Sequence, residues 1–185
     1  MSDSLAVSVV IPALNEAPNL YRILPILRES MNAITDSWEV LVIDGDSQDG
    51  TPAVVAQARE PIRYICEKER GYGRAIMRGV SEARGTYVIT MDADMSHPAE
   101  LINSLWAARN KADIVIASRY VPGGHADQPR FRYFLSRVLN NFFGKGLSIP
   151  VKDMSSGFRL YRKRIFEGMD LEFTNFVILV EILLR

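Results

Sequence analysis

The sequence has a single cysteine, Cys66, and two histidines, His97 and His125, among its 185 residues. One cysteine forms no intrachain disulfide, and a thiolate metal cluster is excluded as well. Two histidines without further ligands of that kind disfavour a zinc site. Because free cysteine is most often simply buried, we expect Cys66 to be a small apolar residue of the core.

Long hydrophobic runs are also missing. A membrane-spanning helix needs roughly 18 or more apolar residues, whereas the nearest stretch, FVILVEILL at 176–184, is short and contains Glu181. The N-terminal residues do not show a basic segment followed by an apolar one, as a secretory signal would. These absences predict a cytoplasmic protein.

The chain has no formal net charge, but its charges are unevenly distributed. Residues 1–118 carry 11 Lys and Arg against 16 Asp and Glu, while residues 119–164 carry ten against two. The basic block is interleaved with aromatic residues and fits a phosphate group, including a lipid head group; nucleic acid could bind such a surface too, but we expect no nucleic-acid partner.

The pattern of apolar runs predicts an α/β fold with a mostly parallel central sheet flanked by helices, as a single domain over 1–185. Continuous apolar runs of the kind found in parallel strands occur at 7–11, 38–44, 62–67, 86–92 and 112–118, with a further strand at 157–162. Helical patterns occupy 18–34, 49–60 and 96–110, and a last helix is expected at 174–185. Pro25 should kink or divide the first of these helices.

Four polar clusters follow the first four predicted strands: PALNEAPN, DGDSQDGT, ERGYGRA and DADMSHP. Ligands of open α/β sheets bind where such carboxyl ends converge, so four clusters on one rim predict a ligand site. A P-loop is absent, and GYGRAI at 71–76 has isoleucine in place of the third glycine of a dinucleotide fingerprint. Both kinds of nucleotide site are therefore disfavoured.

Asp92 and Asp94 leave the fourth strand one residue apart. Two neighbouring carboxylates resist burial unless a cation or a proton lies between them. Mg²⁺ and Mn²⁺ take one or two carboxylates, with diphosphate and water as the remaining ligands. The pair thus predicts a divalent cation that accompanies a nucleotide, with the small Ala93 leaving room for the sugar or the ribose.

Six motifs, VIPALNEAPNL, VIDGDSQDGT, GYGRAIMRGV, MDADMSHP, ASRYVPGG and DMSSGFRLYRK, occur in this order. In order and spacing the sequence resembles the inverting family 2 glycosyltransferases of the GT-A fold, in particular the dolichol-phosphate mannosyltransferases and polyprenyl-phosphate glycosyltransferases. The resemblance covers about residues 7–181. It implies a nucleotide-sugar-binding half at 1–118 and an acceptor-side half at 119–185, which is expected to be truncated relative to relatives.

The resemblance also implies roles for individual residues. Asp92, Asp94 and Arg119 would be catalytic, and Asp94 with Ser96 would hold Mg²⁺ or Mn²⁺; Ser96 departs from the glutamine that relatives often have there. The donor, GDP-mannose or UDP-glucose, would contact Pro12, Leu14, Glu16, Val42, Asp44, Arg74, Asp92, Ala93, Asp94 and Arg119. The acceptor side would comprise Arg130, Arg137, Asp153, Ser155, Ser156 and Arg159.

The nature of the acceptor stays open at this point. A polyprenyl phosphate is already anionic at neutral pH and needs no general base, whereas a sugar hydroxyl needs one, for which Asp153 is the candidate. An amphipathic helix at about 130–146 either packs on the domain or lies against anionic lipid as a peripheral membrane contact.

Two other classes remain as alternatives. A receiver-type signalling domain also gathers aspartates around Mg²⁺, but it expects a lysine after the last strand where this chain reads ASRY. A noncatalytic module that binds nucleotide sugars fits a chain that stops where relatives continue.

Overall fold

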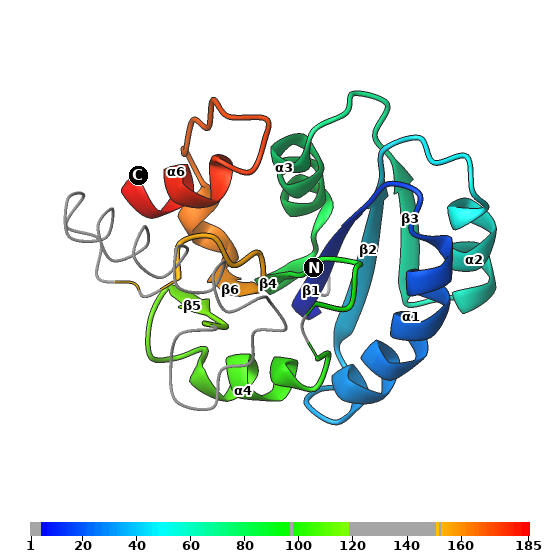
Figure 1. Ribbon diagram of the computed structural model, residues 1–185. Coiled ribbons are helices and arrows are strands. Elements are labelled where there is room, and N and C mark those ends of the chain that lie inside the picture. The colour runs from blue at the N-terminus through cyan, green and yellow to red at the C-terminus, as the bar shows by residue number, and fades with distance from the viewer. Residues whose placement is uncertain (1–4, 97, 119–150, 152) are drawn as a thin grey trace, which may run out of the picture.

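The central sheet has six strands in the order β3-β2-β1-β4-β6-β5 (Figure 1). The computed structural model describes residues 5–96, 98–118, 151 and 153–185. The strands are β1 (Leu5–Ala13), β2 (Trp38–Asp44), β3 (Ile62–Cys66), β4 (Gly85–Thr90), β5 (Ile114–Ile116) and β6 (Arg159–Arg162). β1 pairs in parallel with β2 and β4, and β2 with β3, whereas β6 runs antiparallel to β4 and β5. The mostly parallel sheet predicted from the apolar runs is confirmed.

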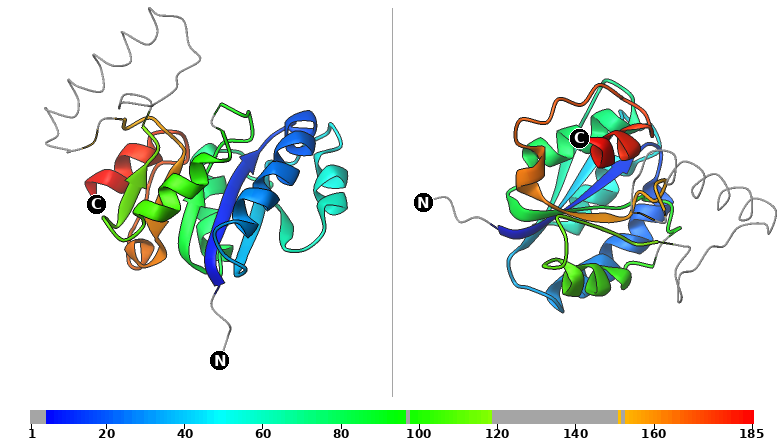
Figure 2. Two further views of the ribbon diagram at one scale, coloured as in Figure 1. Left: turned by 90° about the horizontal axis from the view of Figure 1, so that it is seen from below. Right: turned by 90° about the vertical axis from the view of Figure 1, so that its left-hand side faces the viewer.

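Helices cover both faces of this sheet (Figure 2). One face carries α1 (Ala17–Asn32), α2 (Thr51–Ala58) and α4 (Leu101–Ala108), and the other carries α3 (Tyr72–Glu82), the 3₁₀ helix η1 (Lys163–Phe166) and α6 (Ile178–Leu184). Among the residues that the structure describes, none of the helices combines the length and apolar character that crossing a bilayer requires.

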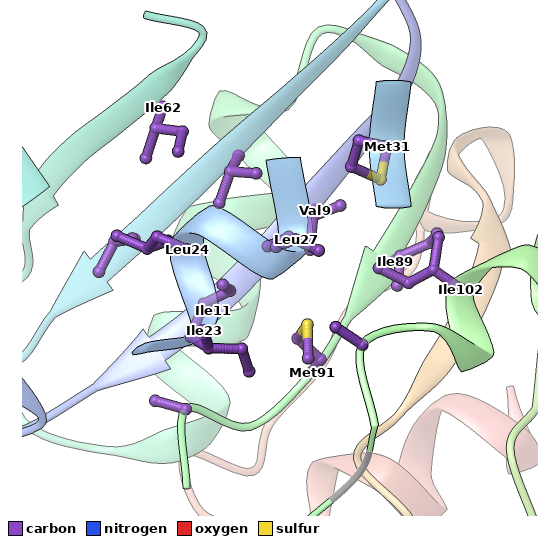
Figure 3. Close-up of a cluster of buried hydrophobic side chains, with 14 of the residues drawn as sticks. Val9, Ile11, Ile23, Leu24, Leu27, Met31, Ile62, Ile89, Met91 and Ile102 are labelled. Atoms are coloured by element: carbon purple, nitrogen blue, oxygen red, sulfur yellow. The ribbon is translucent and has the colours of Figure 1, made fainter. Parts of the chain in front are cut away.

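Alternate residues of the central strands supply both cores, as a strand buried on both faces must. On β1, Val9 and Ile11 pack with α1, whereas Val10 packs against α3 on the opposite face. The α1 face gathers Ile23, Leu24, Leu27 and Met31 over the strands, with Ile89, Met91 and Ile102 beside them (Figure 3). Burial on both sides explains why the run at 7–11 lacks polar alternation apart from Ser8.

Several boundaries differ from the sequence-based expectation. Pro25 lies inside α1 and does not divide it, and α4 begins at Leu101 rather than near Ser96. The predicted strand at 157–162 is present as β6, but it inserts between β4 and β5, a placement that no local pattern specifies.

The expectation that Cys66 is buried is wrong, because the residue is exposed. It is the last residue of β3, and β3 is the edge strand of the sheet. An edge position has a neighbouring strand on one side only, which leaves its terminal residue open to solvent.

Candidate functional site

A cavity of about 530 Å³ opens at the carboxyl ends of β1, β2, β3 and β4. All four polar clusters predicted to share one rim contribute to its wall, and residues from two later segments complete it. Its lining residues are Pro12, Ala13, Leu14, Glu16, Gly45, Glu67, Glu69, Arg70, Gly71, Tyr72, Ala75, Asp92, Ala93, Asp94, Ser96, Ser155, Ser156, Gly157 and Phe176.

The loop after β4 brings Asp92 and Asp94 to the cavity together. Asp92 is half-buried and Asp94 is exposed, while the side chain of Ala93 between them packs into the core. The backbone N–H of Ser96 donates to Oδ1 of Asp94 over 2.9 Å, which holds the turn that follows. The two carboxylates therefore face the same space, although they differ in exposure.

One side of the cavity, here named the β1–β2 wall, consists of residues 12–16 and 44–51. Pro12, Leu14 and Glu16 line the cavity as expected for donor contacts, and Gly45 joins them. The loop after β1 is fixed by the loop after β2, because the N–H of residue 15 donates to Oγ of Ser47 over 2.7 Å. The N–H of residue 16 donates to Thr51 Oγ1 over 3.2 Å, and that of residue 17 to the Asp49 carboxylate over 2.9 Å.

Val42 and Asp44 do not line this cavity, although a donor contact was expected of both. Val42 is fully buried in the core on the α1 face. Asp44 is also fully buried, and its carboxylate accepts hydrogen bonds from Ser47 and, over 2.7 Å, from the hydroxyl of Tyr64. Burial of Tyr64 and its contact with this carboxylate raise the pKa of the phenol. In the structure Asp44 supports the wall from behind.

Arg74, another expected donor contact, is exposed and lies outside the lining, where it forms an ion pair with Glu69. Its neighbour Arg70 does line the cavity, as does Glu67.

The opposite side of the cavity, here named the β6–α6 wall, consists of residues 153–159 and 172–177. Ser155 and Ser156 line it, as expected for the acceptor side. Asp153 is fully buried outside the lining, where its Oδ1 accepts hydrogen bonds from the Ser155 hydroxyl and the Ser156 N–H over 3.2 and 3.1 Å.

Arg159 is fully buried rather than facing the cavity. Its guanidinium donates to the backbone carbonyls of Ser156 over 2.7 Å, Leu179 over 2.6 Å and Met154 over 2.5 Å. The side chain thus connects the segment before β6 to helix α6. The other arginines expected at the site, Arg119, Arg130 and Arg137, lie outside the described residues, as does the helix expected at 130–146.

Three lining residues, Tyr72, Gly157 and Phe176, were given no individual role by sequence reasoning. A Cβ on Gly157 would lie 2.5 Å from the hydroxyl oxygen of Tyr72 and 2.9 and 3.0 Å from the carboxylate oxygens of Asp92, so both groups converge there and only glycine fits. Burial of Tyr72 and the nearby Asp92 charge raise the pKa of the phenol, which therefore stays protonated at neutral pH. The glycine at 157 was the only local signal of this close approach.

The amino-acid sequence also matches a known protein family. The model of the family described as Glycosyl transferase family 2 matches residues 8–169. The chain belongs to this family.

Two relatives of the chain are named as enzymes that make mannosyl phosphate lipids. It is 36% identical to a dolichol-phosphate mannosyltransferase of Pyrococcus furiosus over 98% of this chain and 53% of that protein. It is 34% identical to a polyprenol monophosphomannose synthase of Mycolicibacterium smegmatis over 88% of this chain and 64% of that protein. The chain thus spans between half and two thirds of the length of these two relatives.

Among solved structures, glucosyl-3-phosphoglycerate synthase from Mycobacterium tuberculosis, crystallised with Mn²⁺, UDP and glucosyl-3-phosphoglycerate, aligns with a TM-score of 0.72 at 19% identity, covering 97% of this chain and 64% of that one. Mannosyl-3-phosphoglycerate synthase from Rubrobacter xylanophilus aligns with a TM-score of 0.69 at 24% identity, covering 88% and 55%. These likenesses show the GT-A fold.

The residues of the cavity fit a divalent cation that arrives with a diphosphate. Within the described part of the chain, no three His, Cys, Asp or Glu side chains gather into a closed metal site. A cation such as Mg²⁺ or Mn²⁺ needs only one or two protein carboxylates when phosphate oxygens supply further ligands. The exposed Asp94 and the half-buried Asp92, both on the cavity wall, provide such a pair.

Proposed function

We propose that this protein transfers a hexose, mannose or glucose, from a nucleotide sugar to a polyprenyl phosphate with inversion at the anomeric carbon, using Mg²⁺ or Mn²⁺. The observation that carries the proposal is the convergence of Asp92 and Asp94 on one cavity at the carboxyl ends of the strands, in a chain of glycosyl transferase family 2. The names of the relatives support mannose as the sugar and a lipid phosphate as the acceptor.

In this proposal the nucleoside lies against the β1–β2 wall, where Pro12, Leu14 and Gly45 offer apolar and backbone surface. The diphosphate then reaches Asp94 and Asp92 in the middle of the cavity, and the sugar faces the β6–α6 wall. A bound cation would neutralise the charge that develops on the departing diphosphate. Asp94 would hold that cation, and Asp92, next to the protonated Tyr72, would orient the sugar.

The acceptor enters from the β6–α6 wall in this scheme. A phosphate monoester is anionic at neutral pH, so its oxygen attacks the anomeric carbon without a protein base. Asp153, the expected base for a hydroxyl acceptor, lies outside the cavity lining. A cytoplasmic location with peripheral membrane contact through residues 130–146 belongs to the same proposal.

Titration of GDP-mannose and UDP-glucose with and without Mn²⁺ tests the donor site. We expect Asp94→Ala to lower donor affinity in Mn²⁺ to the level measured without metal, because the variant loses the carboxylate that faces the diphosphate. Glu100→Ala is the matched control, since Glu100 is exposed nearby and does not line the cavity. Normal Mn²⁺-dependent affinity in Asp94→Ala would contradict the role of this residue.

Turnover is measured with the donor that binds and with undecaprenyl phosphate, in solution and on anionic vesicles. Transfer to the lipid phosphate supports the proposal, and donor binding without transfer to it would contradict the acceptor assignment. Reversing the charges of Arg130 and Arg137 should weaken vesicle binding if residues 130–146 contact lipid, and unchanged binding would refute that contact.

A further inference from the structure

Residues 172–177, here named the crossing segment, lie beside the start of α3 (Figure 1). The N–H of Gly73 donates to the carbonyl oxygen of Thr174 over 2.8 Å. A Cβ on Gly73 would lie 2.5 Å from the carbonyl oxygen of Phe173, and one on Gly71 would lie 2.5 Å from that of Thr174. The glycines of this turn therefore make room for another part of the chain.

The crossing segment also brings an aromatic side chain to the cavity. The ring of Phe176 stacks on Tyr72 with centroids 4.0 Å apart and planes 17° from parallel. Both rings line the cavity, and the Tyr72 hydroxyl points to the place at Gly157 where Asp92 also converges. A shift of the crossing segment would thus move the wall beside one of the two acidic residues.

A buried carboxylate holds the crossing segment in place. Glu181 lies in the apolar helix α6 and is 6% exposed, which is costly for a charge without partners. Its Oε1 accepts the N–H of Glu172 over 2.9 Å, its Oε2 accepts the N–H of Phe173 over 3.1 Å, and Arg185 lies 3.6 Å away. Neither the metal chemistry nor the donor contacts described above require a carboxylate at this position.

We propose that Glu181 is a positioning residue for transfer: by binding two N–H groups of the crossing segment, it seats that segment on Gly73 and holds Phe176 against Tyr72 on the acceptor side. The inference rests on the proposed function for its kinetic consequence. Glu181 itself does not line the cavity, so its influence on the reaction passes through the crossing segment.

Glu181→Gln is the test variant, because the amide keeps the size of the side chain but replaces one accepting oxygen with an NH₂ group that cannot accept. Glu172→Gln is the matched control: it removes a charge from the same segment, but its side chain is 72% exposed and pairs with Arg185 only at the surface. Both variants are compared with the wild type well below their unfolding temperatures.

Two readouts separate positioning from general loss of stability. Hydrogen exchange at the Gly73 N–H should be faster in Glu181→Gln, because its acceptor, Thr174, lies in the released segment. The kcat/KM for undecaprenyl phosphate should fall roughly 10- to 150-fold, the effect of losing one hydrogen bond to a charged group, while the Kd of the nucleoside diphosphate stays unchanged. Glu172→Gln should change none of these values.

A double-mutant cycle with Phe176→Ala gives the final test. If Glu181 acts through Phe176, the kinetic loss in the double variant is smaller than the product of the two single losses. The proposal would be overturned if the kinetic loss of the double variant equalled the product of the single losses. It would also be overturned if hydrogen exchange at the Gly73 N–H did not change in Glu181→Gln, or if nucleotide binding weakened as much as kcat/KM fell. If the wild type shows no turnover, the proposed function fails. Hydrogen exchange at the Gly73 N–H then remains as the test of whether Glu181 holds the crossing segment.

Discussion

The two walls of the cavity are held in different ways. In the β1–β2 wall, short side chains such as Ser47, Asp49 and Thr51 accept N–H groups of the neighbouring loop. The β6–α6 wall is held by two long buried side chains. Arg159 donates to backbone carbonyl groups of two segments, and Glu181 on α6 accepts backbone N–H groups of the crossing segment. Apart from Asp44, which is buried behind it, the first wall is held by short loop side chains, whereas the second depends on long buried ionised ones.

Strand pairing explains the difference. β1 and β2 pair in parallel up to Ala13 and Asp44, so the two loops leave the sheet side by side and a short side chain reaches across. The crossing segment follows the 3₁₀ helix η1 and is not part of any strand that the structure describes. An irregular segment at a cavity needs its backbone groups satisfied from elsewhere, and a buried guanidinium or carboxylate can satisfy several at once.

The largest effect should come from Arg159→Met. The variant leaves three buried carbonyl groups without their donor, and we expect a loss of about 3–5 kcal/mol in the free energy of unfolding. Urea denaturation measures it. Arg162→Met on the same strand is the control, because its partly exposed pair with Asp113 at 3.2 Å should contribute no more than about 1 kcal/mol. Equal losses in the two variants would show that the buried carbonyl contacts of Arg159 contribute no more than a partly exposed ion pair.

A smaller effect is expected from Asp44→Asn behind the β1–β2 wall. The amide keeps one accepting oxygen for Ser47 and Tyr64 but presents an NH₂ group where the second oxygen was, at a cost of about 1–3 kcal/mol. Asp46→Asn, at an exposed neighbouring position, should be nearly neutral. Thermal unfolding compares the two, and a loss as large as that of Arg159→Met would show that this wall also depends on a buried charge.

The smallest expected effect is the change in the free energy of unfolding at acidic pH. Burial opposes ionisation of Glu181, but the N–H groups of residues 172 and 173 and the Arg185 charge hold its pKa below the ordinary value of 4.5. The hydroxyl of Thr51 and backbone N–H groups hold the pKa of Asp49 below 3.8 in the same way. Each ionised group therefore stabilises the fold above its ordinary pKa, and this contribution is lost as the pH falls through the lower folded value.

Unfolding free energies measured from pH 7 to pH 3 check this expectation. The difference between the wild type and Glu181→Gln should shrink as the pH falls below 4.5, the ordinary pKa of that carboxyl, and Asp49→Asn should show the same trend at lower pH. A difference that stays constant with pH would mean that the charge of the carboxylate does not hold either wall.

Much of the β1–β2 wall and of the loop after β4 could be predicted from sequence. Apolar runs locate the strands, parallel strands end on one edge, and the polar residues that follow them must meet there, as Glu16, Asp92 and Asp94 do. Position after a strand did not distinguish a residue that faces the cavity from one that supports it. Asp44 and Val42 were both expected at the donor, yet both face inward.

The β6–α6 wall could not be predicted in the same way. Arg159 belongs to the basic block, which suggested phosphate contact, but three carbonyl groups surround its guanidinium in the core. Tyr72 and Phe176 stack although 103 other residues separate them in the chain. No local periodicity encodes such a contact, because it depends on where β6 enters the sheet.

The sequence by itself determined the order of the strands and of α1, α2, α4 and α6, the edge at which polar loops gather and the paired acids after β4, since each follows from residue period and strand direction. Only the tertiary structure decided that β6 inserts antiparallel into the sheet and that Arg159 and Glu181 are buried. It also decided that the crossing segment contacts Gly73. The reason is physical: a charged side chain is stable in the interior only where backbone groups from several segments converge on it, and that convergence exists only in the folded chain.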